Sequence, residues 1–339
     1  MFESRRFCWS PDGISVLFEA DGKIQVSDLS GSLATIAEVG SGEFHFGWTA
    51  NGVVYVSLGD RLQIATREGT VLDEVNLDGA PVGIVPSNTG EWLALLFVDH
   101  ACLVEASQFR VQQRIRGAFF NACFLAQSPS VWLVTETGIV LLHLVSGESY
   151  DLAISGNAMA THAFANGRQS VLYLISASAD SASSLSRYIA SQNVPRFCEC
   201  LPINVPQDCR VLSPTVSHSG DFAFCVIEEG RYRRLAKLDL ASGEISFITP
   251  AELNVQDFSV PGRSSEVYLT GKFEEGDPQL FRLSQPAKLE QISRSKGLVD
   301  VAVAPDGESF AYEFGLSGGG QKLLRMDGPR MQLLFEKRE

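Results

Sequence analysis

Four ionisable residues recur at one position of a repeated strand and are the first candidates for chemistry. Each lies three residues before the end of a short apolar run that leads into a turn. They are Arg6, His45, Asp257 and Asp300. An imidazole with two carboxylates could bind a metal ion or exchange protons with a substrate, and a guanidinium could pair with a carboxylate. We favour the pairing, an Arg6–Asp300 latch between the start and the end of the chain, with solvated polar residues or a ligand or metal pocket as the alternatives.

A second group combines three thiols with an imidazole, which could form a tetrahedral zinc site. Its members are Cys198, Cys200, Cys209 and His218. Their spacing matches no known zinc module, and cysteine is often a buried apolar residue. We therefore predict that no metal is bound by this group.

Residues 315–319 satisfy the G-x-S-x-G pattern of hydrolase nucleophiles. That motif needs a turn from a strand into a helix, whereas this segment lies between two predicted strands. The chain contains no Walker A, dinucleotide-binding, HExxH or C-x-x-C-H haem motif. The sequence therefore predicts no catalytic residue and no cofactor.

Two turns in the second half of the chain carry clustered carboxylates beside one aromatic ring. The residues are Glu228, Glu229, Phe273, Glu274, Glu275 and Asp277. Carboxylates raise the encounter rate with a basic protein, and an aromatic anchor supplies affinity. We predict that both turns lie on one face and bind a basic protein partner, with plain solvated turns as the alternative.

The elements that position these residues form an eightfold repeat. In each copy an apolar run ends in a turn of Pro, Ser, Asn, Asp or Gly and leads into another apolar run, most clearly in FCWSPDGISVLF (7–18) and VAVAPDGESFAYEF (301–314). Successive copies are 36 to 53 residues apart, measured at the last residue of the first run: Trp9, Trp48, Ile84, Phe124, Ala163, Val216, Val260 and Val303. A unit of this length that cannot bury its own faces is typical of one β-propeller blade.

Each copy is predicted to be a four-stranded antiparallel meander, so that the chain is one all-β domain over residues 1–339. The turn before the outermost strand recurs as SDLSG (27–31), HLVSGE (143–148) and LDLASGE (238–244). Eight blades are predicted, with seven as the alternative because the fourth and seventh copies have weak turns. Their predicted bounds are 1–40, 41–78, 79–117, 118–154, 155–205, 206–250, 251–294 and 295–339. Since the first and last copies each contain an inner and an outer strand, we expect the ring to close without an exchanged strand.

The SPDG turn at 10–13, the APDG turn at 304–307 and the recurring outer turns resemble those of the TolB-like and tryptophan-aspartate (WD) repeat families. The resemblance covers the whole chain and implies a β-propeller, although no copy has a Trp-Asp dipeptide or a Gly-His start. It implies little about activity.

The composition limits the possible partners. There are 27 Lys and Arg residues against 40 Asp and Glu, which gives a formal charge of −13. This charge opposes binding to nucleic acid or to anionic membranes, which need clustered cations. No apolar run is long enough for a signal peptide or a membrane span, and seven scattered cysteines suit a reducing compartment. We therefore expect a cytoplasmic protein.

These features predict a noncatalytic scaffold that binds other proteins, as one subunit of a larger intracellular complex. One alternative is a propeller enzyme of the hydrolase, lyase or lactonase type, with His45, Asp257 and Asp300 at the mouth of the channel and His162 nearby. The other is an accessory propeller, similar to the gating domain of prolyl-oligopeptidase-type enzymes, that serves a separate catalytic chain.

Overall fold

The computed structural model describes residues 7–337, apart from positions 29, 41–42, 126–128, 155–158, 167–170, 179–180, 192–193, 204–208, 218, 262–265, 275, 285–287, 293–297, 306–308, 316–320 and 328–329. Some strand residues of the fifth and eighth sheets, Asp300 among them, are described by their backbone alone. None of the described residues belongs to a helix that could cross a membrane.

The described chain forms thirty-two strands. The first four blades contain β1 (Phe7–Trp9), β2 (Val16–Ala20), β3 (Lys23–Ser27), β4 (Leu33–Glu38), β5 (Phe44–Trp48), β6 (Val54–Leu58), β7 (Arg61–Ala65), β8 (Val71–Asn76), β9 (Gly83–Pro86), β10 (Trp92–Leu96), β11 (His100–Glu105), β12 (Arg110–Arg116), β13 (Asn121–Phe124), β14 (Ser130–Val134), β15 (Gly138–His143) and β16 (Ser149–Ala153). The last four contain β17 (Met159–Asn166), β18 (Val171–Ser178), β19 (Ser181–Ser191), β20 (Val194–Pro202), β21 (Cys209–Val216), β22 (Phe222–Glu229), β23 (Tyr232–Asp239), β24 (Ile245–Phe247), β25 (Leu253–Ser259), β26 (Val267–Phe273), β27 (Gln279–Ser284), β28 (Lys288–Gln291), β29 (Leu298–Val303), β30 (Ser309–Gly315), β31 (Gln321–Asp327) and β32 (Arg330–Lys337).

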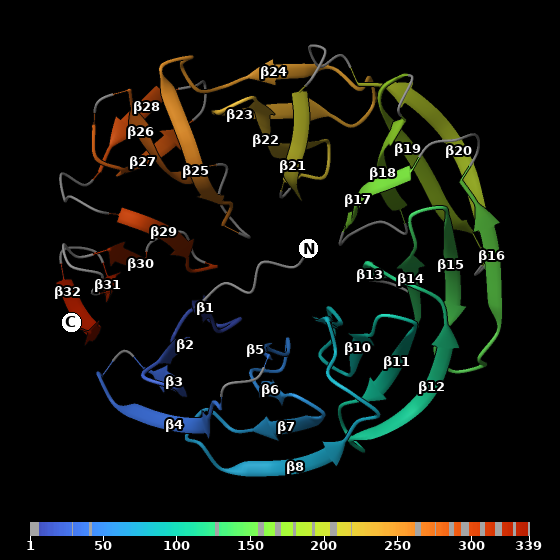
Figure 1. The fold of residues 1–339 in the computed structure, drawn as a ribbon, viewed down its shortest axis with the longest axis horizontal. Coiled ribbons are helices and arrows are strands. Elements are labelled where there is room, and N and C mark those ends of the chain that lie inside the picture. The colour runs from blue at the N-terminus through green and yellow to red at the C-terminus, as the bar shows by residue number, and fades with distance from the viewer. Residues whose placement is uncertain are drawn as a thin grey trace.

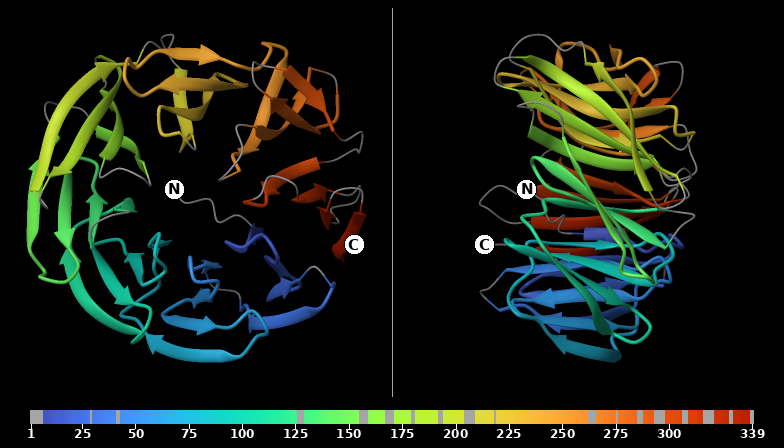
Figure 2. Two further views of the ribbon diagram at one scale, coloured as in Figure 1. Left: turned by 180° about the vertical axis from the view of Figure 1, so that it is seen from behind. Right: turned by 90° about the vertical axis from the view of Figure 1, so that its right-hand side faces the viewer.

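The strands form antiparallel sheets in successive groups of four, from β1–β4 to β29–β32, and the eight sheets are arranged as a ring (Figure 1). The first strand of each sheet lies toward the centre and the fourth lies on the rim. In the edge-on view the strands run between the two faces of the ring (Figure 2). The predicted all-β propeller of eight four-stranded blades is confirmed, and the alternative of seven blades is wrong, because the fourth and seventh repeats both form complete sheets. Among the described residues, the first and last sheets exchange no strand.

The middle strands read as continuous apolar runs because both of their faces are buried. In β14 every residue is buried. Val131 and Leu133 pack in a cluster with the third blade, whereas Trp132 and Val134 pack in a cluster with the fifth. Alternation along one strand therefore joins each blade to both of its neighbours, which is why a single blade cannot bury its own core.

The recurring turn before the outer strand is capped by the side chain of one residue in three blades, although the amides that it binds differ. The Asp28 carboxylate accepts from the Ser30 and Ser32 amides, and the Asp239 carboxylate accepts from the amide and hydroxyl of Ser242. In the fourth blade the Nδ1 atom of His143 takes the place of the carboxylate and accepts from the Ser146 amide at 3.0 Å. In each case a side chain binds backbone amides of the turn and so holds the turn in a tight conformation.

Candidate functional site

The junction between the last and the first blade is built like an ordinary contact between neighbouring blades. The Trp9 indole Nε1 donates to the Ala302 carbonyl at 3.0 Å, across the closing junction. The Trp48 indole makes the same bond to the Cys8 carbonyl, at 3.4 Å, between the second and first blades. Both tryptophans end their inner strands, and both acceptors lie one residue before the end of the preceding inner strand. Trp9 and Trp48 share one repeat position, a signal that our sequence analysis did not use.

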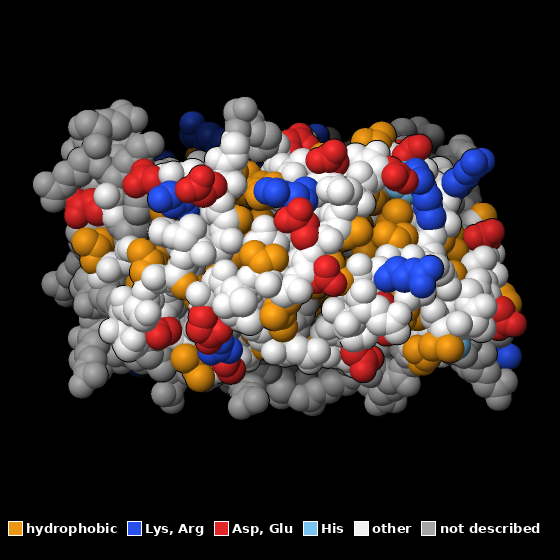
Figure 3. Space-filling model, turned by 90° about the horizontal axis from the view of Figure 1, so that it is seen from below, with side chains coloured by type: hydrophobic (Ala, Val, Ile, Leu, Met, Phe, Trp, Pro, Cys, Tyr) orange, Lys and Arg blue, Asp and Glu red, His pale blue; other side chains and the backbone are white. Residues whose placement is uncertain are grey.

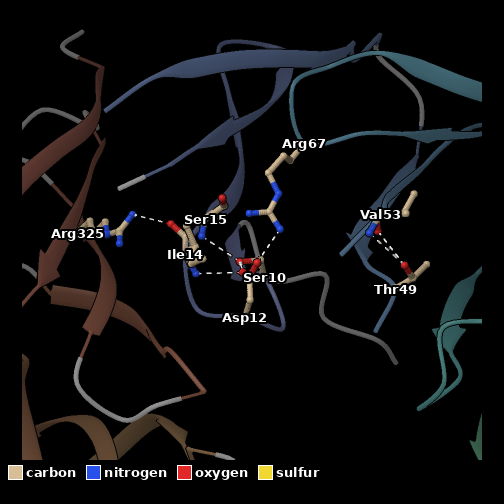
Figure 4. A network of polar contacts seen from close by, with 8 residues as sticks. All are labelled: Ser10, Asp12, Ile14, Ser15, Thr49, Val53, Arg67 and Arg325. Carbon is tan, nitrogen blue, oxygen red and sulfur yellow. Dashed lines mark hydrogen bonds and ion pairs between the residues drawn. The ribbon is translucent and has the colours of Figure 1, made fainter. Parts of the chain in front are cut away.

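A buried arginine reinforces the closing junction (Figure 4). Arg325 is 1% exposed, its guanidinium lies 4.9 Å from the Trp9 ring centre, and its Nη1 donates to the Ile14 carbonyl at 3.2 Å. A charge removed from water is costly unless it is compensated by such partners. Among the described residues, Arg325 and Trp9 therefore connect the last blade to the first.

The predicted latch pair lies outside this description. Arg6 is not among the described residues, and the side chain of Asp300 is not described. The backbone does show that Asp257 and Asp300 are equivalent, because each is the first paired residue after a bulge in its inner strand. The alignment of the seventh and eighth repeats, which places Asp257 and Asp300 at the same position, therefore agrees with the strand pairing. The Arg6–Asp300 pair stays a prediction.

His45 lies on the inner strand of the second blade and is half-buried. Burial lowers the pKa of its imidazole, and a hydrogen bond to the Pro81 backbone offsets part of this effect. Asp257 is also half-buried, and its backbone amide donates to the Thr270 hydroxyl at 3.2 Å. The first and eighth blades lie between the second and the seventh (Figure 1). His45 and Asp257 therefore do not lie on neighbouring blades, and they could act together only across the central channel.

A second network ties the first blade to the second on one face of the ring (Figure 4). The Asp12 carboxylate accepts from the Ser10 hydroxyl and lies 2.7 Å from the Arg67 guanidinium. Burial opposes ionisation of Asp12, but the hydrogen bonds from Ser10 and Arg67 outweigh it and lower the pKa of this carboxyl. This network explains the SPDG turn as a structural device.

The cysteines that could have formed a zinc site are placed on different layers of the ring. Cys198 and Cys200 are exposed on the rim strand β20, whereas Cys209 begins the inner strand β21 (Figure 1). His218 and residues 316–319 of the G-x-S-x-G segment are not described. Within the described residues, no three His, Cys, Asp or Glu side chains are grouped as they would be around a metal ion.

The first acidic turn is a rigid hairpin tip of the sixth blade. Glu229 pairs with Tyr232 across a two-residue turn in which Gly230 has a φ of 60°, a conformation that favours glycine. Glu228 is directly opposite Arg233, whose guanidinium binds its carboxylate at 2.8 Å. The Asn254 side chain of the next blade accepts from the Arg233 amide at 2.9 Å, which holds the tip against the seventh blade.

The second acidic turn is the matching tip of the seventh blade. The Gly276 amide closes it by donating to the Phe273 carbonyl at 2.9 Å. The Phe273 ring is 44% exposed and rests edge-on against the buried Phe281, with 5.9 Å between ring centres. Glu274 and Asp277 are exposed beside it, and Glu275 is not described.

The two tips form a mixed surface in place of the uniformly acidic one that the carboxylates suggested. Tyr232 is 40% exposed, and Arg231 bonds its hydroxyl at 2.9 Å. That hydrogen bond raises the pKa of Arg231, and the charge of Glu274 on the neighbouring tip acts in the same direction. We define the tip surface as Glu229, Arg231, Tyr232, Phe273, Glu274 and Asp277. Because Glu228 is already paired, Glu229, Glu274 and Asp277 are the exposed carboxylates of this surface.

The rim of the first three blades has a different character. Apolar, acidic and basic side chains alternate over it, and none of these kinds forms a continuous field on the face in view (Figure 3). The exposed apolar residues of these outer strands include Leu33 on β4 and the neighbouring Val71 and Leu72 on β8. Scattered apolar side chains on a surface need no functional explanation.

Comparison with known proteins supports the fold and little more. No protein-family model and no curated protein matches the chain. Among solved structures, dihydro-heme d1 dehydrogenase NirN in complex with DHE aligns with a TM-score of 0.68 and 13% identity, over 99% of this chain and 75% of that one. Porphyromonas gingivalis dipeptidyl peptidase 4 aligns at 0.67 and 10% identity over 99% of this chain, which spans only 60% of the peptidase. The C-terminal WD40 domain of Sif2 aligns at 0.64 and 11% identity, over 94% of this chain and 95% of that domain. At these identities the likeness shows a shared propeller fold, found in enzymes and in WD40 domains alike.

Proposed function

We propose that this protein is a noncatalytic scaffold that binds another protein through the tip surface of the sixth and seventh blades, as a subunit of a larger intracellular complex. One observation carries the proposal. Two neighbouring hairpin tips each present an aromatic ring, Tyr232 and Phe273, that is 40% and 44% exposed. Tyrosine and other aromatic residues dominate the affinity of protein interfaces because they bury a large area at a small entropic cost.

The tips are braced before any partner arrives. The Asn254 side chain and the Glu228–Arg233 pair hold the sixth tip, and Phe281 supports the ring of Phe273. A surface that is already ordered loses little conformational entropy on binding.

The charges of the tip surface favour a basic partner. Its three exposed carboxylates belong to a chain with a formal charge of −13, so a cationic protein is attracted over several ångströms. Arg231 limits the local field and can pair with a carboxylate at the edge of the partner. Binding should therefore weaken as salt concentration rises, because salt screens exposed charges.

Purification of the tagged protein, followed by identification of the bound protein and measurement of its affinity, tests the proposal. The double variant Tyr232→Ser with Phe273→Ser is expected to bind at least about thirty-fold more weakly, the loss of about 2 kcal/mol typical of an anchor residue. The matched control is Tyr150→Ser with Phe197→Ser, because these rings on the outer strands β16 and β20 are 37% and 47% exposed. Equal affinities for the two double variants, or a wild-type protein that is only monomeric in native mass spectrometry, would refute the proposal.

A further inference from the structure

One face of the ring carries all the hairpins that join the second and third strands of the blades. In each antiparallel blade this hairpin and the connection to the next blade lie at the same end of the strands, so the tips share one face. The described tips of the first, second and fourth blades consist of Asp-Gly (21–22), Gly-Asp (59–60) and Thr-Glu-Thr (135–137). Only three described tips present an exposed large apolar side chain: Val98, Tyr232 and Phe273.

Val98 is an unusual residue for a hairpin turn. The turn closes where the Phe97 amide donates to the His100 carbonyl at 2.8 Å, which places Val98 in a position usually taken by Gly, Pro, Asn, Asp or Ser. Its side chain is 77% exposed. An apolar, β-branched residue that breaks the local rule at a solvent-exposed tip is a candidate for binding.

The turn that presents Val98 is rigid. The Phe97 and His100 rings are stacked with 4.3 Å between their centres and 4° between their planes. His100 is 5% exposed, and its Nδ1 atom bonds the Asp99 carboxylate at 2.6 Å. The Gly117 amide donates to the Asp99 carbonyl at 2.9 Å. A buried ring stack and two hydrogen bonds thus hold an exposed valine in place, an arrangement similar in kind to the bracing of the sixth and seventh tips.

The surroundings of Val98 combine apolar and charged groups. Val82, which is 38% exposed, lies beside the same hairpin, because its amide donates to the Leu96 carbonyl at 2.7 Å. The Asp99 side chain is 83% exposed, and the Asp78 side chain, which is 72% exposed, is paired with the half-exposed Arg114. An apolar centre with a charged rim is the pattern of an interface anchor.

We infer that the Val98 tip is a second anchor for the same basic partner, which therefore spans the face of the ring from the third blade to the seventh. This inference rests on the proposed function. The third and seventh blades are four positions apart in an eight-bladed ring and lie on opposite sides of its axis (Figure 1). Both anchors are apolar and braced, and each combines exposed carboxylates with one arginine, Arg114 or Arg231, so one basic partner with two apolar contacts fits both. Two contacts on one rigid partner also reinforce each other, because the second forms at a high effective concentration.

Site-specific photocrosslinking tests the inference in the full chain. A benzoylphenylalanine probe is placed at position 98, 273 or 145 in the host cell, and the crosslinked protein is identified by mass spectrometry. Val145 is the matched control, since it is also 77% exposed but lies in the turn between β15 and β16, on the opposite face. We expect the same protein to be captured from positions 98 and 273, and not from 145.

Affinity measurements with the identified, purified partner complete the test. Val98→Glu is expected to weaken binding at least tenfold, whereas Val145→Glu should change it less than twofold. If the partner is crosslinked from position 273 but not from 98, and Val98→Glu binds it as tightly as the wild type, then Val98 is not a second anchor. The proposed function is unaffected by that result. Capture of different proteins at 98 and 273 also overturns the second anchor. If no protein is crosslinked from position 273 and the double variant Tyr232→Ser with Phe273→Ser binds its partner as tightly as the wild type, the proposed function itself is overturned.

Discussion

Gly47 in the inner strand β5 has no room for a side chain, which makes it a sensitive test of the packing between strands. Gly47 is paired with Tyr55 of β6, and the tyrosine ring lies over it. A Cβ atom at Gly47 would lie 2.7 Å from Cζ and 3.0 Å from Cε1 of Tyr55, and closer still to the hydroxyl. Tyr55 is 6% exposed and packs in the cluster between the second and third blades, so its ring cannot move away freely.

The variant Gly47→Ala should lower the free energy of unfolding. Forcing a methyl group into a packed site costs about 1 to 3 kcal/mol. The alanine also restricts the unfolded chain, which returns about 0.4 to 1 kcal/mol. The net loss expected at Gly47 is therefore about 1.3 kcal/mol from the midpoints of these ranges and at most about 2.6 kcal/mol, measured by urea unfolding followed by tryptophan fluorescence.

A second background decides whether the clash is the cause. In Tyr55→Leu the shorter side chain does not reach the space above Gly47, so Gly47→Ala should there stabilise the protein by about 0.4 to 1 kcal/mol. The effect of the same substitution thus changes sign between the two backgrounds. An equal loss in both would show that the tyrosine ring is not the obstacle and that the packing argument is wrong.

Three further outcomes follow from the structure. Asp239→Ala removes the acceptor of a recurring turn and should cost about 1 kcal/mol in urea unfolding, while Asp239→Asn keeps an acceptor oxygen and should cost less. Trp9→Phe leaves the Ala302 carbonyl without its indole donor at the closing junction and should cost about 2 kcal/mol; a stability unchanged from wild type would contradict the role of this bond. Burial lowers the pKa values of His45 and His162 below 6.5, so between the folded value and 6.5 the unfolded chain binds more protons. Stability should therefore be complete above about pH 7 and fall as pH drops below 6.5, with a smaller fall when both histidines are replaced by glutamine.

The sequence determined the architecture because its signals are local. Each blade is written as apolar runs separated by turns, and this pattern needs only neighbouring residues to be recognised. The recurrence of such turns at Asp28, His143 and Asp239 was sufficient to predict four strands in a blade, and the repeat length predicted eight blades. Even the ring closure without an exchanged strand was predictable, since the first and last repeats each contain all four strands.

The tertiary structure decided which of the candidate side chains are available. Glu228 is bound by Arg233 across its hairpin, Arg325 is buried against Trp9, and Val98 is 77% exposed. The first pair forms within one hairpin, whereas the second depends on how the last blade meets the first, so that its partners lie at opposite ends of the chain. Strand periodicity sets the face on which a side chain lies, but the twist and packing of neighbouring sheets set what that face touches. Local pattern therefore determined the fold, and side-chain contacts within and between blades determined the surface on which its function is proposed.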